Sequence, residues 1–127
     1  MSSDKITFIG KGITIACTDL ARSVRFYETT LGAVREPGDG YGCPWFRLGP
    51  LVITLMPNAA KRTPAEFPAH AMPIVWLEVP DLEAAHQELI RSGVEIVQAP
   101  NGQSMMVADP DGLIIEVWQA ESEPEIN

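Results

Sequence analysis

The chain has 127 residues, of which 46% are hydrophobic and 20% charged, a composition that predicts one packed globular domain rather than a disordered segment. Seventeen acidic against nine basic residues give a net charge of −8 with no basic cluster, so we do not expect nucleic acid as a partner. No apolar run approaches the roughly 20 residues of a membrane-spanning helix, and residues 1–20 lack a secretory-signal pattern. We therefore expect a cytoplasmic protein that does not bind membranes, with Cys17 and Cys43 reduced.

The first half of the chain reads as a strand, a helix and further strands. Residues 12–18 (GITIACT) alternate as a strand does, and Asp19 then provides a helix N-cap. Gly32 is suited to end that helix in the left-handed conformation. One apolar stripe with helical spacing is predicted to face the core: Leu20, Val24, Tyr27 and Leu31. Strands are predicted over 33–37, 43–48 and 51–56, separated by glycine and proline.

The second half repeats the first with an offset of 62 residues, since Asp19 falls on Asp81 and the segment LVITLM (51–56) falls on LIIEVW (113–118). A strand, a helix capped by Asp81 and ended at Gly93, and strands over 94–98, 104–108 and 113–118 are predicted. The sequence DPDG (109–112) is interpreted as a turn. Within one domain (1–127) we assign a first module (8–56), a linker (57–73), a second module (74–119) and an acidic tail (120–127).

Strand alternation divides the repeated strands into two faces. One face is wholly apolar and is predicted to pack under the helices: Ile13, Ile15, Cys17, Leu51, Ile53, Leu55, Val75, Leu77, Val79, Leu113, Ile115 and Val117. The opposite face mixes small, aromatic and acidic side chains: Gly12, Thr14, Ala16, Val52, Thr54, Met56, Ile74, Trp76, Glu78, Ile114, Glu116 and Trp118. A sheet that is covered by helices on one side and curved around a ligand on the other would have such a lining.

Two tandem βαβββ units, with TDLARSVRFYETTLG after the first strand and VADPDGLIIEVWQ near the end, resemble the vicinal oxygen chelate superfamily. This superfamily includes glyoxalase I, extradiol dioxygenases and the fosfomycin- and bleomycin-resistance proteins. The resemblance covers roughly residues 8–119. It implies an α+β fold with a cupped mixed sheet, helices on its outer face, and a homodimer with shared cavities.

The resemblance also locates four strand positions at which metal-dependent members carry His or Glu ligands. In this chain those positions hold Gly12, Thr54, Ile74 and Glu116. Only the carboxylate is a strong donor, and a divalent ion needs several convergent oxygen or nitrogen ligands. We therefore expect no metal and no other cofactor.

The remaining features of the mixed face favour a cavity for a flat ligand. By similarity to the bleomycin-resistance proteins, Trp76 and Trp118 would stack on planar rings while Glu78 or Glu116 balances a positive charge. The alternative is that both indoles only fill a dimer interface or a cavity floor. The predicted ligand-binding residues are Trp76, Trp118, Met56, Thr54, Thr14, Glu78, Trp45 and Tyr41, of which Tyr41 would close over the ligand from the loop at 35–43.

Two functions follow from this site. The first is a metal-free, homodimeric binding protein that sequesters a planar small molecule, such as an antibiotic, with a cationic ligand favoured by the carboxylates. The alternative is a lyase, isomerase or dioxygenase in which Glu116 is the catalytic base, with or without a divalent metal from other donors. A scaffold with an empty cavity is a third, weaker interpretation.

Overall fold

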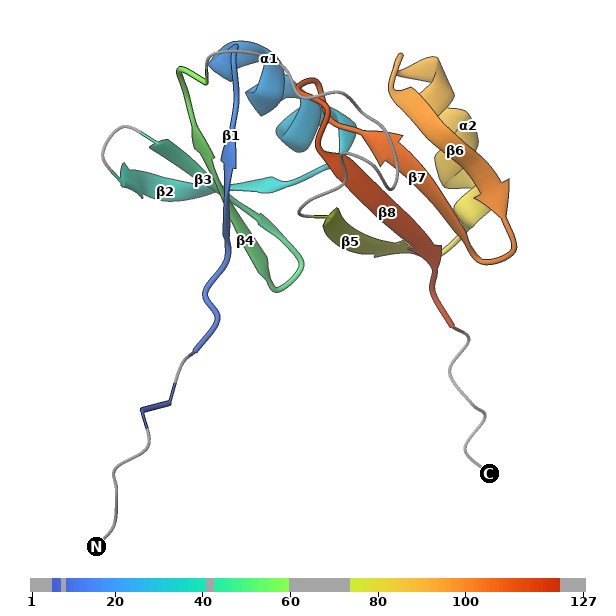
Figure 1. Ribbon diagram of the computed structural model, residues 1–127, viewed down its shortest axis with the longest axis horizontal. Helices are drawn as coiled ribbons and strands as arrows, with labels where there is room; N and C mark the ends of the chain where they lie inside the picture. Colours follow the sequence, from blue (N-terminus) through green and yellow to red (C-terminus); the bar gives the residue numbers. More distant parts are fainter. Residues whose placement is uncertain (1–5, 8, 41–42, 60–73, 122–127) are drawn as a thin grey trace, which may run out of the picture.

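The computed structural model describes residues 6–7, 9–40, 43–59 and 74–121. Tyr41 and most of the predicted linker (57–73) lie outside the described residues. The two halves of the chain form separate four-stranded sheets, each with its own helical segment (Figure 1). The predicted α+β fold with two βαβββ modules is therefore confirmed. None of the described helices is long and apolar enough to span a membrane.

The sheet of the first module has the strand order β1-β4-β3-β2, with β1 parallel to β4 and the other neighbours antiparallel. Its elements along the chain are β1 (Ile13–Ala16), α1 (Leu20–Val24), η1 (Arg25–Thr30), β2 (Val34–Gly40), β3 (Cys43–Leu48) and β4 (Leu51–Met56). The strands predicted over 43–48 and 51–56 are confirmed, and the strand predicted over 33–37 extends further than predicted.

The second module repeats this arrangement, with the strand order β5-β8-β7-β6. Its elements are β5 (Ile74–Val79), α2 (Leu82–Arg91), β6 (Glu95–Asn101), β7 (Ser104–Ala108) and β8 (Ile114–Gln119). Again the first and last strands, β5 and β8, are parallel, and the other pairs are antiparallel. The internal repeat in the sequence is thus a structural repeat.

Both helical segments begin and end at the predicted residues. The side chains of Asp19 and Asp81 accept hydrogen bonds from the backbone N–H three residues further on, at 3.2 and 3.1 Å. These bonds satisfy amides that have no partner inside the first helical turn. After each segment the chain turns at a glycine with positive φ, Gly32 (78°) and Gly93 (76°).

The first helical segment differs from the prediction in its second half. From Arg25 it widens into the π-helix η1, in which the N–H of Leu31 bonds to the carbonyl of Phe26. The wider turn brings two consecutive aromatic side chains, Phe26 and Tyr27, into the core. Both are buried, and their ring centroids lie 4.9 Å apart in an edge-to-face arrangement. The apolar stripe predicted from regular helical spacing therefore accounts for only part of the surface that this helical segment buries in the core.

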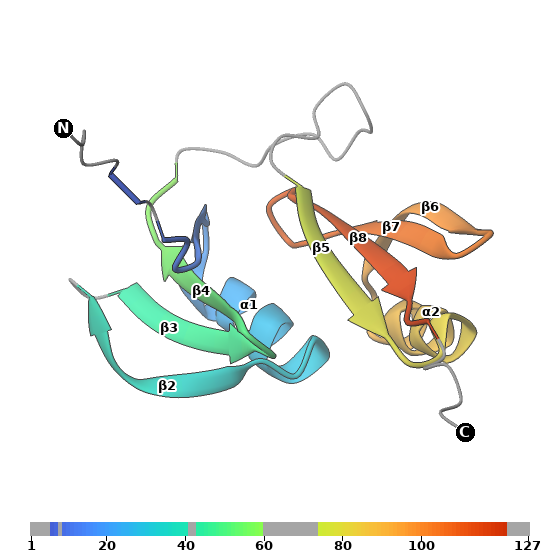
Figure 2. The ribbon, with the colours of Figure 1, turned by 90° about the horizontal axis from the view of Figure 1, so that it is seen from below.

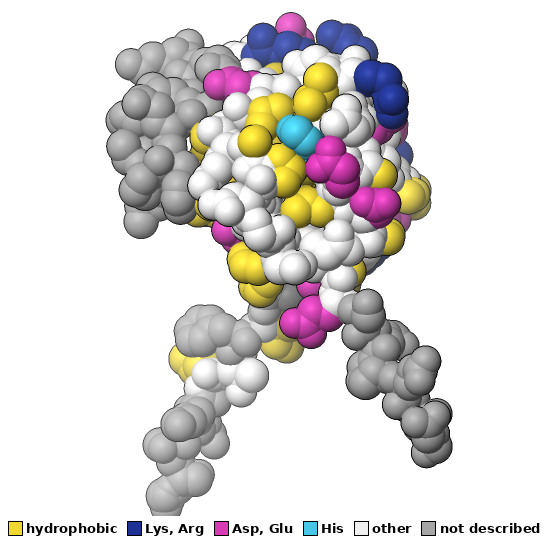
Figure 3. Space-filling model, turned by 90° about the vertical axis from the view of Figure 1, so that its right-hand side faces the viewer, with side chains coloured by type: hydrophobic (Ala, Val, Ile, Leu, Met, Phe, Trp, Pro, Cys, Tyr) yellow, Lys and Arg dark blue, Asp and Glu magenta, His cyan; other side chains and the backbone are white. Residues whose placement is uncertain are grey.

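The core lies on the predicted faces of the sheets. All twelve side chains assigned to the apolar face belong to the hydrophobic core or pack partly buried against it. The mixed face is more open, with Trp76 67% and Met56 48% exposed. In both ribbon views α1 lies on the side of the first sheet that faces the second module (Figure 2). The α2 side of the molecule shows hydrophobic side chains beside acidic ones, with basic side chains gathered at one end (Figure 3).

The predicted turn at 109–112 also connects the two modules. Gly112 donates to the carbonyl of Asp109 at 3.0 Å and has a φ of 91°, which confirms the turn. The buried carboxylate of Asp109 accepts hydrogen bonds from the Tyr27 hydroxyl at 2.7 Å and from two backbone N–H groups of its own loop. Burial raises the pKa of the Asp109 carboxyl and of the Tyr27 hydroxyl.

A second buried carboxylate completes this connection. Asp111 accepts hydrogen bonds from the Thr18 hydroxyl at 2.6 Å and the Ser23 hydroxyl at 3.3 Å, and it forms an ion pair with Arg22 at 3.2 Å. Its partners all lie at the start of α1 or just before it, in the first module. Since buried carboxylates are costly without such partners, the two aspartates hold the modules together through a defined set of contacts.

Candidate functional site

The mixed face of the second sheet alternates indoles and carboxylates across two neighbouring strands. In the parallel register of β5 and β8, Trp76 is paired with Glu116 and Glu78 is paired with Trp118. The two tryptophans therefore lie diagonally on one face, with a carboxylate beside each. This arrangement follows from the sequence, because Trp76 and Glu78 are two residues apart on one strand and Glu116 and Trp118 occupy matching positions on the other.

Three of the predicted site residues line one cavity of about 1090 Å³, at the end of this face. They are Trp76, Glu78 and Trp118; the other lining residues are Gln103, Gln119, Ala120 and Glu121. The described lining carries two carboxylates and no basic side chain. Flat aromatic surface beside unneutralised acid is a combination that attracts cations.

Sequence reasoning missed Gln103, Gln119 and Glu121. Gln103 lies in the turn between β6 and β7, and its carbonyl accepts the backbone N–H of Gln119 at 2.7 Å. Glu121 was assigned to the acidic tail, although it stands only three residues beyond Trp118. Strand alternation alone could not find these residues, since they belong to chain segments at and beyond the strand ends.

Glu116, the candidate base of the enzymatic alternative, is half-buried in the middle of the sheet. Its register neighbours are Trp76 on β5 and Met106 on β7. It does not appear in the lining of the cavity at Trp118. The structure therefore places it beside the aromatic site, on the same face, and not within it.

The other predicted ligand-binding residues belong to the first sheet. Thr14, Thr54 and Trp45 lie side by side on β1, β4 and β3, and Met56 follows on β4. Trp45 is 44% exposed while its neighbour Phe46 is fully buried, which settles its orientation toward the mixed face. The Thr54 hydroxyl donates to the backbone carbonyl of Pro44 at 3.2 Å. Tyr41 lies outside the described residues.

The four positions implied as metal ligands are divided between the two sheets. Gly12 and Ile74 line a common cavity of about 510 Å³, whose lining does not include Thr54 or Glu116. A Cβ atom added to Gly12 would stand only 2.3 Å from the carbonyl oxygen of Val52, so the backbone leaves no room for a coordinating side chain there. Among the described residues, no group of three or more His, Cys, Asp or Glu side chains could hold a metal ion. The residues at these four positions therefore do not form a ligand set for a divalent metal ion.

Comparison with known proteins bears out the fold. The sequence model of the glyoxalase/bleomycin resistance protein/dioxygenase superfamily matches residues 11–117, nearly the whole described body. The chain belongs to this superfamily. A search of curated proteins finds no match.

Among solved structures, a protein from the mobile metagenome of V. pseudocholerae is 22% identical, covers 95% of this chain and 100% of its own, and has a TM-score of 0.71. A virulence protein from Salmonella typhimurium is 21% identical over 94% of this chain and 98% of its own, with a TM-score of 0.65. The fosfomycin resistance protein FosX from Mesorhizobium loti is 16% identical over 92% and 95% of the two chains, with a TM-score of 0.67. At these identities the likeness shows the superfamily fold alone.

Proposed function

We propose that this superfamily member is a metal-free binding protein that sequesters a planar, cationic small molecule of the kind represented by antibiotics. The observation that carries the proposal is that Trp76, Glu78 and Trp118 line one cavity on the mixed face of the second sheet. Indole rings offer flat surfaces for stacking, and cation–π attraction adds to that stacking when the guest is positively charged.

The charge of the cavity supports a cationic guest. Glu78 and Glu121 line it, no basic side chain among the described lining opposes them, and the chain carries a net charge of −8. An anionic ligand would meet two carboxylates without a counter-charge, and an unpaired charge brought near apolar surface is unfavourable.

The absence of a metal from the proposed mechanism rests on the donor set. The positions that would hold the ligands contain a glycine, a threonine, an isoleucine and a single carboxylate, Glu116. Val52 also occupies the space into which a side chain at residue 12 would project. Binding is therefore proposed to depend on stacking and charge and not on coordination.

We also propose a homodimer, as in other members of the superfamily. The face of the first sheet leaves Trp45 and Met56 nearly half exposed, and Trp76 is two-thirds exposed on the second sheet. Large apolar side chains gathered on open sheet faces are typical of surfaces that a second subunit covers.

The experiment is a titration of tryptophan fluorescence in the presence of a chelator. N-methylquinolinium, a flat cation, is compared with quinoline, which has the same ring system and is neutral at neutral pH. The proposal predicts saturable quenching by the cation and weaker quenching by quinoline. Equal quenching by both compounds would contradict the preference for a cation. Quenching that appears only when a divalent metal replaces the chelator would contradict the metal-free proposal and favour the enzymatic alternative.

A further inference from the structure

The second sheet carries negative charge that no basic side chain of its own strands balances. Strands β5, β6, β7 and β8 contain three glutamates and no lysine, arginine or histidine. In the first sheet, by contrast, Glu36 of β2 forms an ion pair with Arg47 of β3. Glu78 and Glu116 have no such partner among the described residues. Both carboxylates therefore remain available to a positively charged guest.

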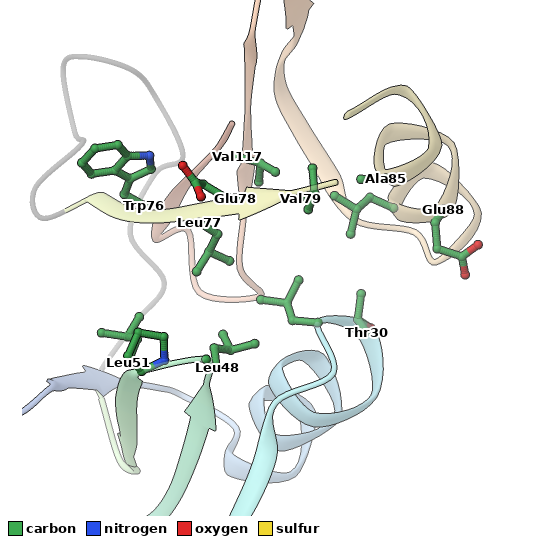
Figure 4. A pocket seen from close by; sticks show the side chains of 14 residues that line it. Thr30, Leu48, Leu51, Trp76, Leu77, Glu78, Val79, Ala85, Glu88 and Val117 are labelled. Atoms are coloured by element: carbon green, nitrogen blue, oxygen red, sulfur yellow. The ribbon is translucent and has the colours of Figure 1, made fainter. Parts of the chain in front are cut away.

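These two carboxylates alternate with the two indoles on the mixed face. In the parallel register of β5 and β8, Glu116 stands beside Trp76 and Glu78 stands beside Trp118. One strand spacing and a step of two residues separate Glu78 from Glu116, which places their Cα atoms roughly 8 Å apart. Figure 4 shows Trp76 and Glu78 projecting from β5 on the side opposite Leu77. Each carboxylate thus has an aromatic ring beside it and is set apart from the other carboxylate.

Both pairs of carboxylate and indole can be reached by one guest. Trp76 is 67% exposed, Glu78 is exposed, and Glu116 is half-buried. The cavity of about 1090 Å³ is lined by Trp76, Glu78 and Trp118, and Trp76 is also the register neighbour of Glu116. A flat guest that lies across both indoles would therefore extend from the carboxylate inside the cavity to the one beside it.

We propose that the guest of this face carries two positive charges, held apart on one flat frame, with one charge at each pair of carboxylate and indole. This inference rests on the proposed function and narrows it from planar cations to planar dications. A single charge leaves one of the two carboxylates without a counter-charge. A second charge on the same guest gains both an ionic partner and an aromatic neighbour.

Three aromatic probes separate the number of charges from their spacing. Methyl viologen carries two charges at opposite ends of two rings, diquat carries two charges side by side, and N-methyl-4-phenylpyridinium has the frame of methyl viologen with one charge. Isothermal titration calorimetry uses the full chain after metal ions have been removed with a chelator. Methyl viologen should bind about fivefold more tightly than the monocation, and more tightly than diquat. Equal binding of methyl viologen and either other probe would overturn the inference.

The same titrations distinguish the failure of this inference from the failure of the proposed function. If the monocation binds and methyl viologen binds no more tightly, the guest has one charge, and only the inference fails. If none of the three probes binds, the proposed function fails as well.

Glutamine variants assign the second charge to this face. Glu116→Gln should remove most of the preference for methyl viologen over the monocation, while Glu78→Gln should weaken the binding of both probes. The matched control is Glu28→Gln, which removes the same charge from an exposed position in the first module and should leave the preference unchanged. An unchanged preference in Glu116→Gln would overturn the inference. So would equal losses in Glu116→Gln and Glu28→Gln, because the preference would then arise from the net charge of the chain.

Discussion

The hydroxyl of Tyr27 donates a 2.7 Å hydrogen bond to the carboxylate of Asp109, a residue 82 positions away in the other module. Both side chains are almost completely buried. The contact connects the aromatic pair of the widened helix to the turn before β8, the strand that carries Trp118. The position of the candidate site relative to the first module therefore depends on a buried polar contact as well as on apolar packing.

Removing that hydroxyl should destabilise the fold. Tyr27→Phe leaves one oxygen of Asp109 without its side-chain donor, and a buried acceptor that loses its partner costs about 1–3 kcal/mol. Urea unfolding should show this loss in the free energy of unfolding. The control is Glu28→Gln, an exposed neighbour, which should change stability by less than about 0.5 kcal/mol. Equal effects of the two substitutions would contradict the role given to the contact.

The raised pKa of Asp109 predicts a direction for the pH dependence. Burial is its main cause and raises the pKa above the ordinary value of 3.8, while hydrogen bonds from Tyr27 and the backbone lower it. The folded state thus binds the proton more tightly than the unfolded state. The stability of the protein relative to Asp109→Asn should be greatest below about pH 3.8 and fall as the pH rises through the folded pKa. Urea unfolding over a pH series measures this difference, and a difference that grows with pH would contradict the prediction.

Neither Cys17 nor Cys43, which were predicted to be reduced, takes part in a disulfide bond in the described part of the chain. Cys17 is fully buried in the core, and burial raises the pKa of its thiol, so little reactive thiolate is present. In a Cys43→Ser variant, the remaining thiol should react with a thiol reagent about a hundredfold more slowly in the native state than in urea. Rapid labelling of the native variant would contradict this prediction and show that the segment around Cys17 opens readily.

Gly12 and Gly10 offer a matched pair of substitutions. A methyl group at residue 12 would overlap the backbone of Val52, whereas nothing lies within 4 Å of a Cβ at residue 10. Gly12→Ala should therefore destabilise the fold by about 1–3 kcal/mol, while Gly10→Ala should be nearly neutral. Thermal or urea unfolding separates the two. If Gly12→Ala is also neutral, the backbone adjusts easily, and the argument against a ligand at this position loses its steric part.

The repeat, the two helix starts and the division into an apolar and a mixed face could all be predicted, because they depend on local periodicity. Asp19 and Asp81 cap because they bond to amides three residues away, and strand alternation assigns Leu77 and Trp76 to opposite faces without knowledge of the partner strands. Such features need only a few neighbouring residues.

The features that could not be predicted depend on long-range contacts. The turn at 109–112 was recognised, but nothing in its sequence shows that Asp109 and Asp111 bond to the first module. The orientation of Trp45 required the register with β4, and the widening at η1 required the buried aromatic pair. The same holds for the four positions implied as metal ligands: in the structure of one chain, Gly12 and Ile74 line a common cavity that does not include Thr54 or Glu116, which their spacing along the sequence does not show.

The aromatic cavity is tested most directly by the indole N–H signals in a nitrogen–proton spectrum of the labelled protein, assigned with Trp76→Ala and Trp118→Ala. With a chelator present, addition of N-methylquinolinium should shift the signals of both Trp76 and Trp118, and Glu78→Gln should weaken the response. If both signals stay in place, or shift only after a divalent metal is added, the cavity is not a metal-free site for flat cations.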